Sequence, residues 1–232
     1  GDVLRLRLRP TSALDYRPGQ FVHVVRPDGL TRSYSLASVP ELDDTLELHV
    51  RRMPGGAMSG YLFDELREGA PLSVRGPFGH CFYVPGRPSQ PLLLAGTGTG
   101  VAPLLGIVRG ALRCRHEGPI ELHHGALEPR GLYAHDELVA LAERHPTFRY
   151  APCVLRGGDG ALVVEGDLKE RFLARVRATP GARVFLCGPP DLVTPLKKAI
   201  FLAGTPLREI LSDPFVTAAA PASPAGTPAR AG

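Results

Sequence analysis

The spacing of hydrophobic residues changes near residue 88, and this change constrains the fold more than any other feature of the chain. Before it, hydrophobic and polar residues alternate in short segments. After it, short runs of consecutive hydrophobic residues alternate with helical patterns. A period of two is typical of antiparallel strands with one buried face, whereas repeated strand and helix segments are typical of a parallel sheet. The pattern therefore predicts two domains of different architecture.

The first domain, residues 1–88, is expected to be a small antiparallel β-barrel or sandwich. Its strand-like segments are separated by turn sequences such as Pro54-Gly55-Gly56, and they lie at 3–8, 21–25, 46–50 and 72–74. Three apolar residues share one face of the third segment: Leu46, Leu48 and Val50. A short helix is expected at about 59–67, with Ser59 as its N-cap.

The second domain, residues 89–215, is expected to be an α/β domain built on a parallel sheet. Its four strand-like runs lie at 91–95, 120–124, 148–154 and 184–187. Each run precedes a helical pattern, at 102–115, 135–144, 168–177 and 190–203. Four strand–helix units predict a parallel sheet with helices on both faces.

Composition excludes several classes of protein. Glycine (27) and proline (24) are too frequent among 232 residues for an all-helical bundle, while 44% hydrophobic residues argue against a disordered chain. The net charge is +4, but the 24 arginines and three lysines are scattered, so we expect no nucleic-acid binding. No apolar run approaches the roughly 18 residues of a transmembrane helix, so we expect no membrane span.

The cysteines and histidines do not form a recognisable metal site. The four cysteines lie more than 30 residues apart, at Cys81, Cys114, Cys153 and Cys187. This spacing does not match zinc or [2Fe-2S] ligand motifs and is typical of free thiols in a reducing compartment. His123 and His124 are adjacent in a strand and point to opposite faces. We therefore expect no metal and a cytoplasmic location.

The two ends of the chain have distinct character. Residues 216–232 are rich in alanine and proline and contain no aromatic residue, so a disordered tail is expected there. The chain begins at Gly1, without methionine, and its first residues already alternate as in a strand. This beginning suggests that an upstream segment is missing.

A glycine-rich segment, Gly96-Thr97-Gly98-Thr99-Gly100-Val101-Ala102-Pro103, lies between a buried-type strand and a helix. Glycine allows the backbone to approach a diphosphate, and the N-terminus of a helix offers free N–H groups to its charge. The third glycine comes one residue too early for the G-x-G-x-x-G dinucleotide motif. A tight strand-to-helix turn without a ligand is the alternative.

Three further segments have both a binding and a structural interpretation. Arg32-Ser33-Tyr34-Ser35 offers a guanidinium group for binding phosphate, a ring for stacking and hydroxyl groups for hydrogen bonds. The alternative is an ordinary polar strand edge. Gly55-Gly56-Ala57-Met58-Ser59 could hold phosphate through backbone N–H groups, or is a capped turn. Cys187-Gly188-Pro189-Pro190 ends the last strand-like run and starts a helix, at the ligand-binding edge of the parallel sheet, although burial is the usual state of such a cysteine.

Taken in order, these motifs resemble the ferredoxin-NADP reductase family. The resemblance depends on R-x-Y-S, G-G-x-x-S, G-P-F-G, G-T-G-T-G-x-A-P and C-G-P-P, and it covers roughly residues 1–215. It implies a barrel that binds FAD, or less commonly FMN, and a parallel-sheet domain that binds NADH or NADPH.

The resemblance also implies roles for individual residues. Arg32 would contact the flavin phosphate, Tyr34 would pack on the flavin ring and Ser35 would hydrogen-bond near N5. The other flavin-binding residues would be Ser33, Val50, Gly56, Met58 and Ser59. The nicotinamide nucleotide would be bound by Gly96, Thr97, Gly98, Thr99, Gly100, Val101, Pro103, Gly125, Cys187, Gly188 and Pro189.

Three of these expectations concern the reaction itself. Ser35, Cys187 and Phe215 would lie at the hydride-transfer site, with Phe215 covering the flavin. Electrons would pass to an iron–sulfur protein or domain. Glu128, which follows the second sheet strand, would repel a 2′-phosphate, so NADH is expected over NADPH. A flavin reductase that releases reduced flavin, or a non-catalytic flavin-binding electron-transfer subunit, are the alternatives.

Overall fold

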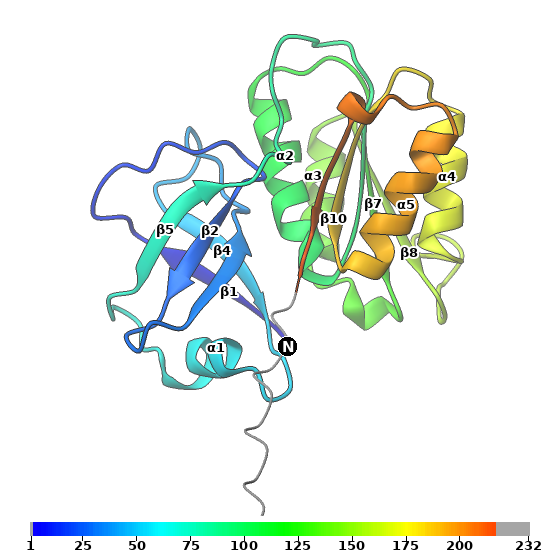
Figure 1. The fold of residues 1–232 in the computed structure, drawn as a ribbon. Coiled ribbons are helices and arrows are strands. Elements are labelled where there is room, and N and C mark those ends of the chain that lie inside the picture. Colours follow the sequence, from blue (N-terminus) through cyan, green and yellow to red (C-terminus); the bar gives the residue numbers. More distant parts are fainter. Residues whose placement is uncertain (1, 217–232) are drawn as a thin grey trace, which may run out of the picture.

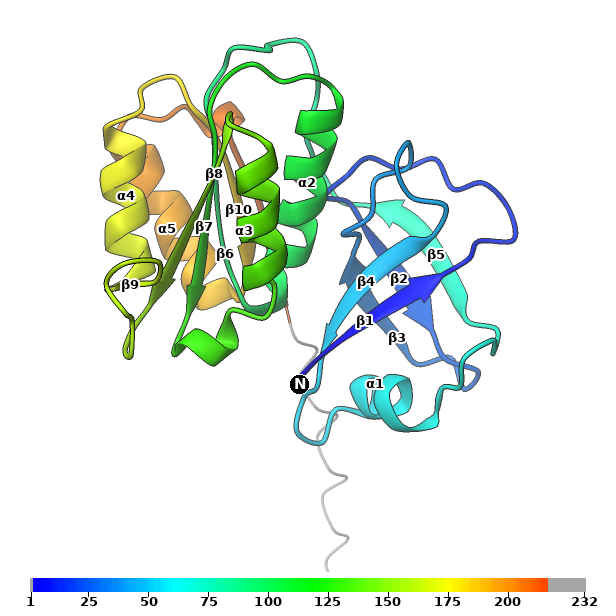
Figure 2. The same cartoon turned by 180° about the vertical axis from the view of Figure 1, so that it is seen from behind.

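The computed structural model describes residues 2–216, and the expected tail lies outside them except for Val216. Figures 1 and 2 show two parts side by side, a β-rich first half and a second half in which helices flank a sheet. The predicted fold class, an antiparallel β domain followed by an α/β domain built on a parallel sheet, is confirmed. Within residues 2–216, no helix is long and apolar enough to cross a lipid bilayer.

The first half contains two antiparallel sheets. One pairs β1 (Val3–Leu8) with β4 (Leu46–Arg51), and the other has the order β3 (Thr31–Ser35), β2 (Phe21–Val25), β5 (Ser73–Phe78). An isolated bridge between Leu36 and Leu48 connects the two sheets. The alternation of β4 is as predicted, because its three apolar residues are buried in the core of this half: Leu46, Leu48 and Val50.

The short helix begins earlier than expected. It consists of one α-helical turn, α1 (Ala57–Gly60), followed by a π-helical segment (Tyr61–Glu65). Gly56 occupies the N-cap position, so the prediction of Ser59 as N-cap is wrong. The Ser59 hydroxyl instead accepts a hydrogen bond from the Met53 N–H (3.1 Å) and donates to the Gly56 carbonyl (3.1 Å). The serine therefore closes the preceding loop from inside the helix.

The second half is a six-stranded parallel sheet with the order β11-β10-β6-β7-β8-β9. The strands are β6 (Leu92–Thr97), β7 (Ile120–Ala126), β8 (Phe148–Val154), β9 (Val164–Glu165), β10 (Arg183–Gly188) and β11 (Ile210–Pro214). The helices are α2 (Val101–Arg113), α3 (His135–Arg144), α4 (Leu168–Arg177) and α5 (Pro190–Leu202). Short 3-10 helices lie at Gly98–Gly100, Pro129–Gly131 and Leu207–Glu209. Helices α2 and α3 pack on one face of the sheet, and α4 and α5 pack on the other.

Strands β9 and β11 were not expected from the sequence. Strand β9 has only two residues, too few to show a period. Strand β11 comes directly after the 3-10 helix Leu207–Glu209, whereas each of the predicted strands precedes a helical pattern. It pairs with β10 at the edge of the sheet. The chain beyond this edge strand reaches Phe215, whose N–H donates to the Gly188 carbonyl (2.7 Å).

Helix α2 contacts the first half through glycines. An ideal Cβ atom on Gly106 would lie 3.0 Å from the Leu36 carbonyl oxygen, and one on Gly110 would lie 2.9 Å from Pro18 Cγ. From the opposite side, a Cβ on Gly19 would lie 2.7 Å from Ile107 Cγ1. These contacts bring the backbones of the two halves close together, and they fix the position of α2, whose N-terminus adjoins the glycine-rich loop.

Replacing Gly106 with valine should weaken this contact. The Leu36 carbonyl is backbone and cannot rotate away, so we expect Gly106→Val to lower the free energy of unfolding by about 1–3 kcal/mol. Denaturant titration of the purified protein measures the change. Arg113→Val adds the same side chain at an exposed position of α2 and should change stability much less. Equal effects of the two substitutions would contradict the packing argument.

Candidate functional site

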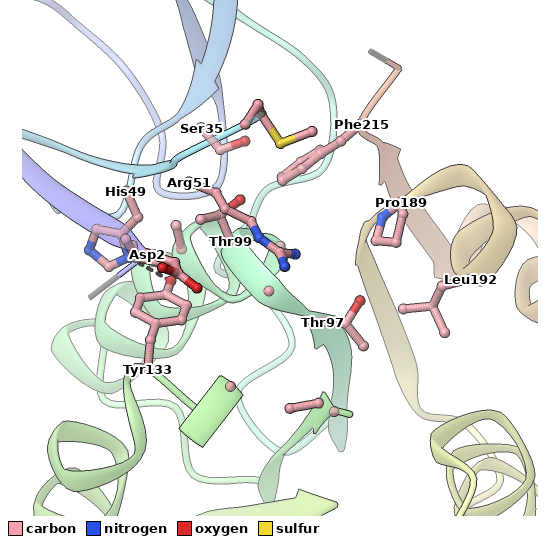
Figure 3. Close-up of a pocket in the computed structure, with 18 of the residues that line it drawn as sticks. Asp2, Ser35, His49, Arg51, Thr97, Thr99, Tyr133, Pro189, Leu192 and Phe215 are labelled. Carbon is pink, nitrogen blue, oxygen red and sulfur yellow. Dashed lines mark hydrogen bonds between the residues drawn. The ribbon is translucent and has the colours of Figure 1, made fainter. Parts of the chain in front are cut away.

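A cavity of about 1940 Å³ lies between the two halves, beside their contact at α2. Its wall combines β3, β4 and the loop before α1 with the loops that follow β6, β7 and β10. Drug-sized ligands occupy pockets of roughly 300–1,000 Å³, so this cavity has room for two of them. Figure 3 shows Ser35 and Arg51 on one side and Thr97, Pro189 and Leu192 on the other.

The part of the wall formed by β3 contains all four residues of the R-x-Y-S motif: Arg32, Ser33, Tyr34 and Ser35. The Arg32 guanidinium donates to the Thr31 carbonyl (2.8 Å), and within the described residues no carboxylate pairs with it. Burial raises the pKa of Tyr34 to about 12, so its phenol stays neutral. This strand therefore offers a cation, a neutral aromatic ring and hydroxyl groups to a single ligand.

The next part of the wall is formed by Gly56, at the end of the loop before α1, and by Met58 and Ser59 of α1 itself. An ideal Cβ on Gly56 would lie 2.6 Å from Ser59 Oγ and 2.8 Å from Met53 Cβ. Because the Ser59 hydroxyl is already bonded within the loop, it holds the loop closed. The backbone of Gly56 is consequently what the loop can present to a phosphate.

The glycine-rich loop lies across the cavity, between β6 and α2. Thr97, Gly98, Thr99 and Gly100 line the wall, and Gly98 has a φ of +52°, which favours glycine. An ideal Cβ on Gly100 would lie 2.7 Å from the Cys187 carbonyl carbon, so no side chain fits there. The N–H groups at the start of α2 favour a negatively charged ligand at this point.

Three more expected residues line the second half of the wall: Gly125, Pro189 and Phe215. A Cβ on Gly125 would lie 2.6 Å from Leu168 Cδ2 and 2.9 Å from Thr97 Cγ2, so the carboxyl end of β7 packs tightly here. In Figure 3, the Phe215 ring points into the cavity from the end of β11.

The structure leaves six expected residues outside the wall: Val50, Gly96, Val101, Pro103, Cys187 and Gly188. Val50 and Cys187 are buried, and the Cys187 Sγ lies 3.7 Å from the Cys81 Sγ. Burial raises the pKa of Cys187, so it remains a neutral thiol. The contribution of Cys187 to the cavity comes from its backbone, which packs under Gly96 and Gly100.

Several residues of the wall were missed by the sequence analysis, including Asp2, Arg5, His23, His49, Arg51 and Tyr133. The Arg51 guanidinium lies beside Gly98, 3.5 Å from where a Cβ would stand. Within residues 2–216, Arg51 has no salt-bridge partner, whereas Arg52 pairs with Asp64 (2.6 Å). Arg51 therefore adds an uncompensated positive charge next to the glycine-rich loop.

A chain of hydrogen bonds crosses the boundary between the halves at one side of the cavity. His49 Nδ1 lies 2.7 Å from the Tyr133 hydroxyl, and His49 Nε2 lies 2.9 Å from Glu47 Oε1. The hydrogen bond with His49, together with that from Arg7, lowers the pKa of Glu47 to about 2. Glu47 is therefore ionised, and it orients the imidazole of His49.

The residues of the wall fit a site for two nucleotide cofactors. Each half supplies a glycine loop with no room for a Cβ, at Gly56 and at Gly100. The first half also supplies two arginines without an ion-pair partner in the described chain, Arg32 of β3 and Arg51 of β4, and Arg51 lies beside the glycine-rich loop of the second half. Such loops and cations are suited to diphosphates. The fold and the cavity together define a protein that brings a flavin nucleotide and a pyridine nucleotide together.

Comparison with known protein families divides the chain into the same two parts. Residues 2–83 match the oxidoreductase FAD-binding domain, and residues 94–198 match the oxidoreductase NAD-binding domain. With both matches in the expected order, the chain belongs to the ferredoxin-NADP reductase family. Its cofactors are therefore FAD and a nicotinamide nucleotide.

Individual relatives are longer than this chain. It is 34% identical over 214 residues to the ferredoxin–NAD(P)+ reductase component of naphthalene 1,2-dioxygenase/salicylate 5-hydroxylase systems from Ralstonia, covering 92% of this chain and 65% of that protein. An aromatic O-demethylase reductase subunit from Amycolatopsis is 37% identical over 222 residues, which cover 94% of this chain and 66% of that protein. The crystal structure of an Amycolatopsis cytochrome P450 reductase superposes with a TM-score of 0.84 at 36% sequence identity. The superposition covers 92% of this chain and 65% of that one. The chain thus spans just under two thirds of these relatives.

A side chain at Gly56 should impair FAD binding. Gly56→Val would force the Ser59 side chain and Met53 apart and open the loop, so we expect the purified protein to retain less than a tenth of the FAD of the wild type. The ratio of flavin to protein absorbance measures retention. Gly60→Ala is the matched control, because no atom lies within 4 Å of its added Cβ. If Gly56→Val keeps its FAD, the loop does not hold the cofactor.

Proposed function

We propose that this chain is the flavin and nicotinamide module of an NAD(P)H-dependent reductase. Hydride passes from the nicotinamide nucleotide to FAD, and electrons then pass to an iron–sulfur protein or domain that serves an oxygenase. The observation that carries this proposal is a cavity shared by both halves, whose two sides present glycine loops suited to diphosphates, at Gly56 and at Gly98–Gly100. FAD supplies the hydride-accepting and electron-releasing chemistry when bound.

Residues of the wall position the two cofactors. Arg32 and the Gly56 loop bind the FAD diphosphate, Tyr34 packs on the flavin ring, and the Ser35 hydroxyl hydrogen-bonds at its hydride-accepting edge. The Gly98–Gly100 loop and Arg51 bind the nicotinamide nucleotide diphosphate. Phe215 covers the flavin ring until the nicotinamide displaces it. In this arrangement the protein contributes proximity and orientation.

The relatives and the thiols support the proposed acceptor and location. The Ralstonia relative is named as a reductase component of a dioxygenase system, and a solved relative is a ferredoxin reductase in carbazole 1,9a-dioxygenase. This supports an oxygenase system as the destination of the electrons. All four cysteines are free, which supports a reducing compartment, the cytoplasm.

Anaerobic addition of NADH to the FAD-loaded protein tests the proposal. We expect the flavin absorbance near 450 nm to bleach completely with one equivalent of NADH. Retention of bleached FAD after gel filtration distinguishes the reductase from a flavin reductase, which would release it. A protein that binds FAD but does not bleach with NADH or NADPH would be a non-catalytic electron-transfer subunit and would contradict the proposal.

We further infer that NADH is preferred over NADPH. Glu128 lines the cavity beyond the glycine-rich loop. Its carboxylate pairs with Arg130 (2.9 Å) and Arg156 (2.9 Å), and it is less exposed than either arginine. The two guanidinium groups are therefore directed to Glu128, and its negative charge opposes a 2′-phosphate.

Neutralising Glu128 should shift this preference toward NADPH. Glu128→Gln frees Arg130 and Arg156, so we expect kcat/KM for NADPH to rise about tenfold, which corresponds to about 1.4 kcal/mol, with little change for NADH. Glu143→Gln removes a carboxylate from the exposed end of α3 and should leave the ratio unchanged. Equal efficiency of the wild type with both nucleotides would contradict the inference.

A further inference from the structure

The G-P-F-G motif ends strand β5 and lies beside the cavity without lining it. Every other motif of the resemblance contributes a residue to the cavity wall, whereas this one, Gly76–Gly79, does not. Gly79 has a φ of +93°, and an ideal Cβ there would lie 2.9 Å from Phe21 Cδ1. The motif therefore packs against Phe21, and it leaves Phe78 42% exposed.

Three aromatic rings contact one another on the outer face of the sheet β3-β2-β5. Val22 and Val24 are fully buried in the core, so Phe21 and His23 project from the opposite face of β2. The Phe78 ring lies 5.8 Å from the Phe21 ring and 4.5 Å from the His23 ring, as in favourable aromatic pairs. Phe21 and His23 line the cavity, whereas Phe78 does not. The cluster therefore extends from the cavity wall to the protein surface.

Strand pairing connects this cluster to the R-x-Y-S motif. Phe21 of β2 pairs with Ser35 of β3 on one side and with Phe78 of β5 on the other. Neighbouring strands lie about 4.8 Å apart, so Phe78 is about 10 Å from Ser35. In the proposed function, Ser35 lies at the hydride-accepting edge of the flavin. Phe78 is therefore an exposed group close to the place from which electrons leave.

The sheet that carries the cluster is positively charged. Strands β2, β3 and β5 contain Arg32, Arg75 and His23 but no aspartate or glutamate. Arg75 is exposed and lies opposite His23, and within residues 2–216 no carboxylate forms a salt bridge with it. In the turn between β2 and β3, Asp28 pairs with Arg26. The outer face of this sheet consequently offers positive charge without a compensating carboxylate of its own.

Arg17 adds to this charge beside the G-P-F-G motif. The Gln20 side chain accepts the Arg17 backbone N–H (2.8 Å) and donates to the Gly79 carbonyl (3.2 Å), so it holds the two segments together. The Arg17 guanidinium lies over the Phe82 ring, 4.9 Å from its centroid, and no described carboxylate pairs with it. Exposed, unpaired guanidinium groups of this kind attract an acidic protein.

We propose that an acidic iron–sulfur protein docks on this face, with Phe78 at the centre of the contact and Arg75 and Arg17 at its rim. The inference rests on the proposed function and adds the place where the electron acceptor binds. Phenylalanine and arginine are enriched at protein interfaces, and a few such residues supply most of the binding energy.

The stoichiometry of the reaction favours a small contact of this kind. It follows NADH + 2 oxidised ferredoxin → NAD⁺ + 2 reduced ferredoxin + H⁺, in which each ferredoxin takes one electron and the proton enters solvent. A one-electron acceptor must therefore dock and leave twice for each NADH. Electron-transfer contacts are among the smallest protein interfaces, whereas a stable dimer buries a much larger apolar area. One exposed ring with charges at its rim fits the transient partner.

The second half offers a matched control. Phe201 of α5 is 46% exposed, a fraction close to that of Phe78. It lies near the end of α5 that is remote from the cavity, because this helix begins at Pro190 and lines the cavity through Leu192. Electron transfer slows steeply with distance, so an acceptor docked at Phe201 would be poorly placed.

The experiment measures NADH-dependent reduction of a Rieske-type [2Fe-2S] ferredoxin of negative net charge by the FAD-loaded protein. Such ferredoxins have higher reduction potentials than plant-type ones, which makes the step favourable. In the wild type, kcat/KM for ferredoxin should fall as ionic strength rises, because salt screens the attraction. Arg75→Glu should lower it about tenfold at low salt and flatten this dependence, whereas Arg75→Lys should stay close to the wild type. Arg177→Glu, which changes the net charge equally at the exposed end of α4, should have little effect.

Phe78→Ala should lower kcat/KM for ferredoxin about tenfold at every ionic strength, and Phe201→Ala should leave it unchanged. In all variants, FAD bleaching by NADH and reduction of 1,4-benzoquinone should stay close to the wild type, because a small neutral acceptor needs no docking face. Rates are referred to bound FAD, so that loss of flavin from Phe78→Ala is kept apart from loss of docking.

Unchanged ferredoxin reduction in either Arg75→Glu or Phe78→Ala would overturn the proposal, and so would an equal loss with ferredoxin and benzoquinone. If Phe78→Ala alters the sedimentation of the protein but not ferredoxin reduction, the face joins copies of this chain and the proposal is wrong. Failure of the proposed function is distinct, because the wild type would then not bleach with NADH.

Discussion

The close packing of helix α2 against the first half is the constraint on which the cavity depends. Gly106 and Gly110 bring the helix backbone to the Leu36 carbonyl and to Pro18, and Gly19 accommodates Ile107 from the other side. Protein interiors are packed too densely for such contacts to shift without cost. The N-terminus of α2 carries the glycine-rich loop, so the same contact sets the distance between this loop and the β3 and β4 strands across the cavity.

Local pairing determines which charges remain for ligands. The chain has many arginines, but Arg52 pairs with Asp64, Arg26 pairs with Asp28, and Arg109 pairs with Asp43. Arg32 and Arg51 have no such partner within the described chain, and both face the cavity. The modest net charge therefore says little about binding, whereas the distribution of unpaired guanidinium groups places positive charge where diphosphates are expected.

The sequence predicted the architecture well because its signals are local. Alternation identified β1, β2 and β4, and the strand–helix repeats identified the parallel sheet. The same alternation buries Leu46, Leu48 and Val50, which directs Glu47, His49 and Arg51 to the other face of β4. A local sequence pattern does not show which residues contact that face. Tyr133 is 84 residues from His49, so their contact depends on how the two halves pack.

The C-G-P-P motif shows how a motif can be required for geometry without its side chain reaching the ligand. Cys187 is on β10 opposite Gly96 of β6, and its carbonyl group occupies the space that a Cβ on Gly96 or Gly100 would need. Its thiol packs against that of Cys81 from the first half. A larger side chain here would push Cys81 and Gly19 away from α2, since Gly19 contacts the Cys81 carbonyl. A small, neutral residue at this position thus holds both the glycine-rich loop and the contact between the halves in place.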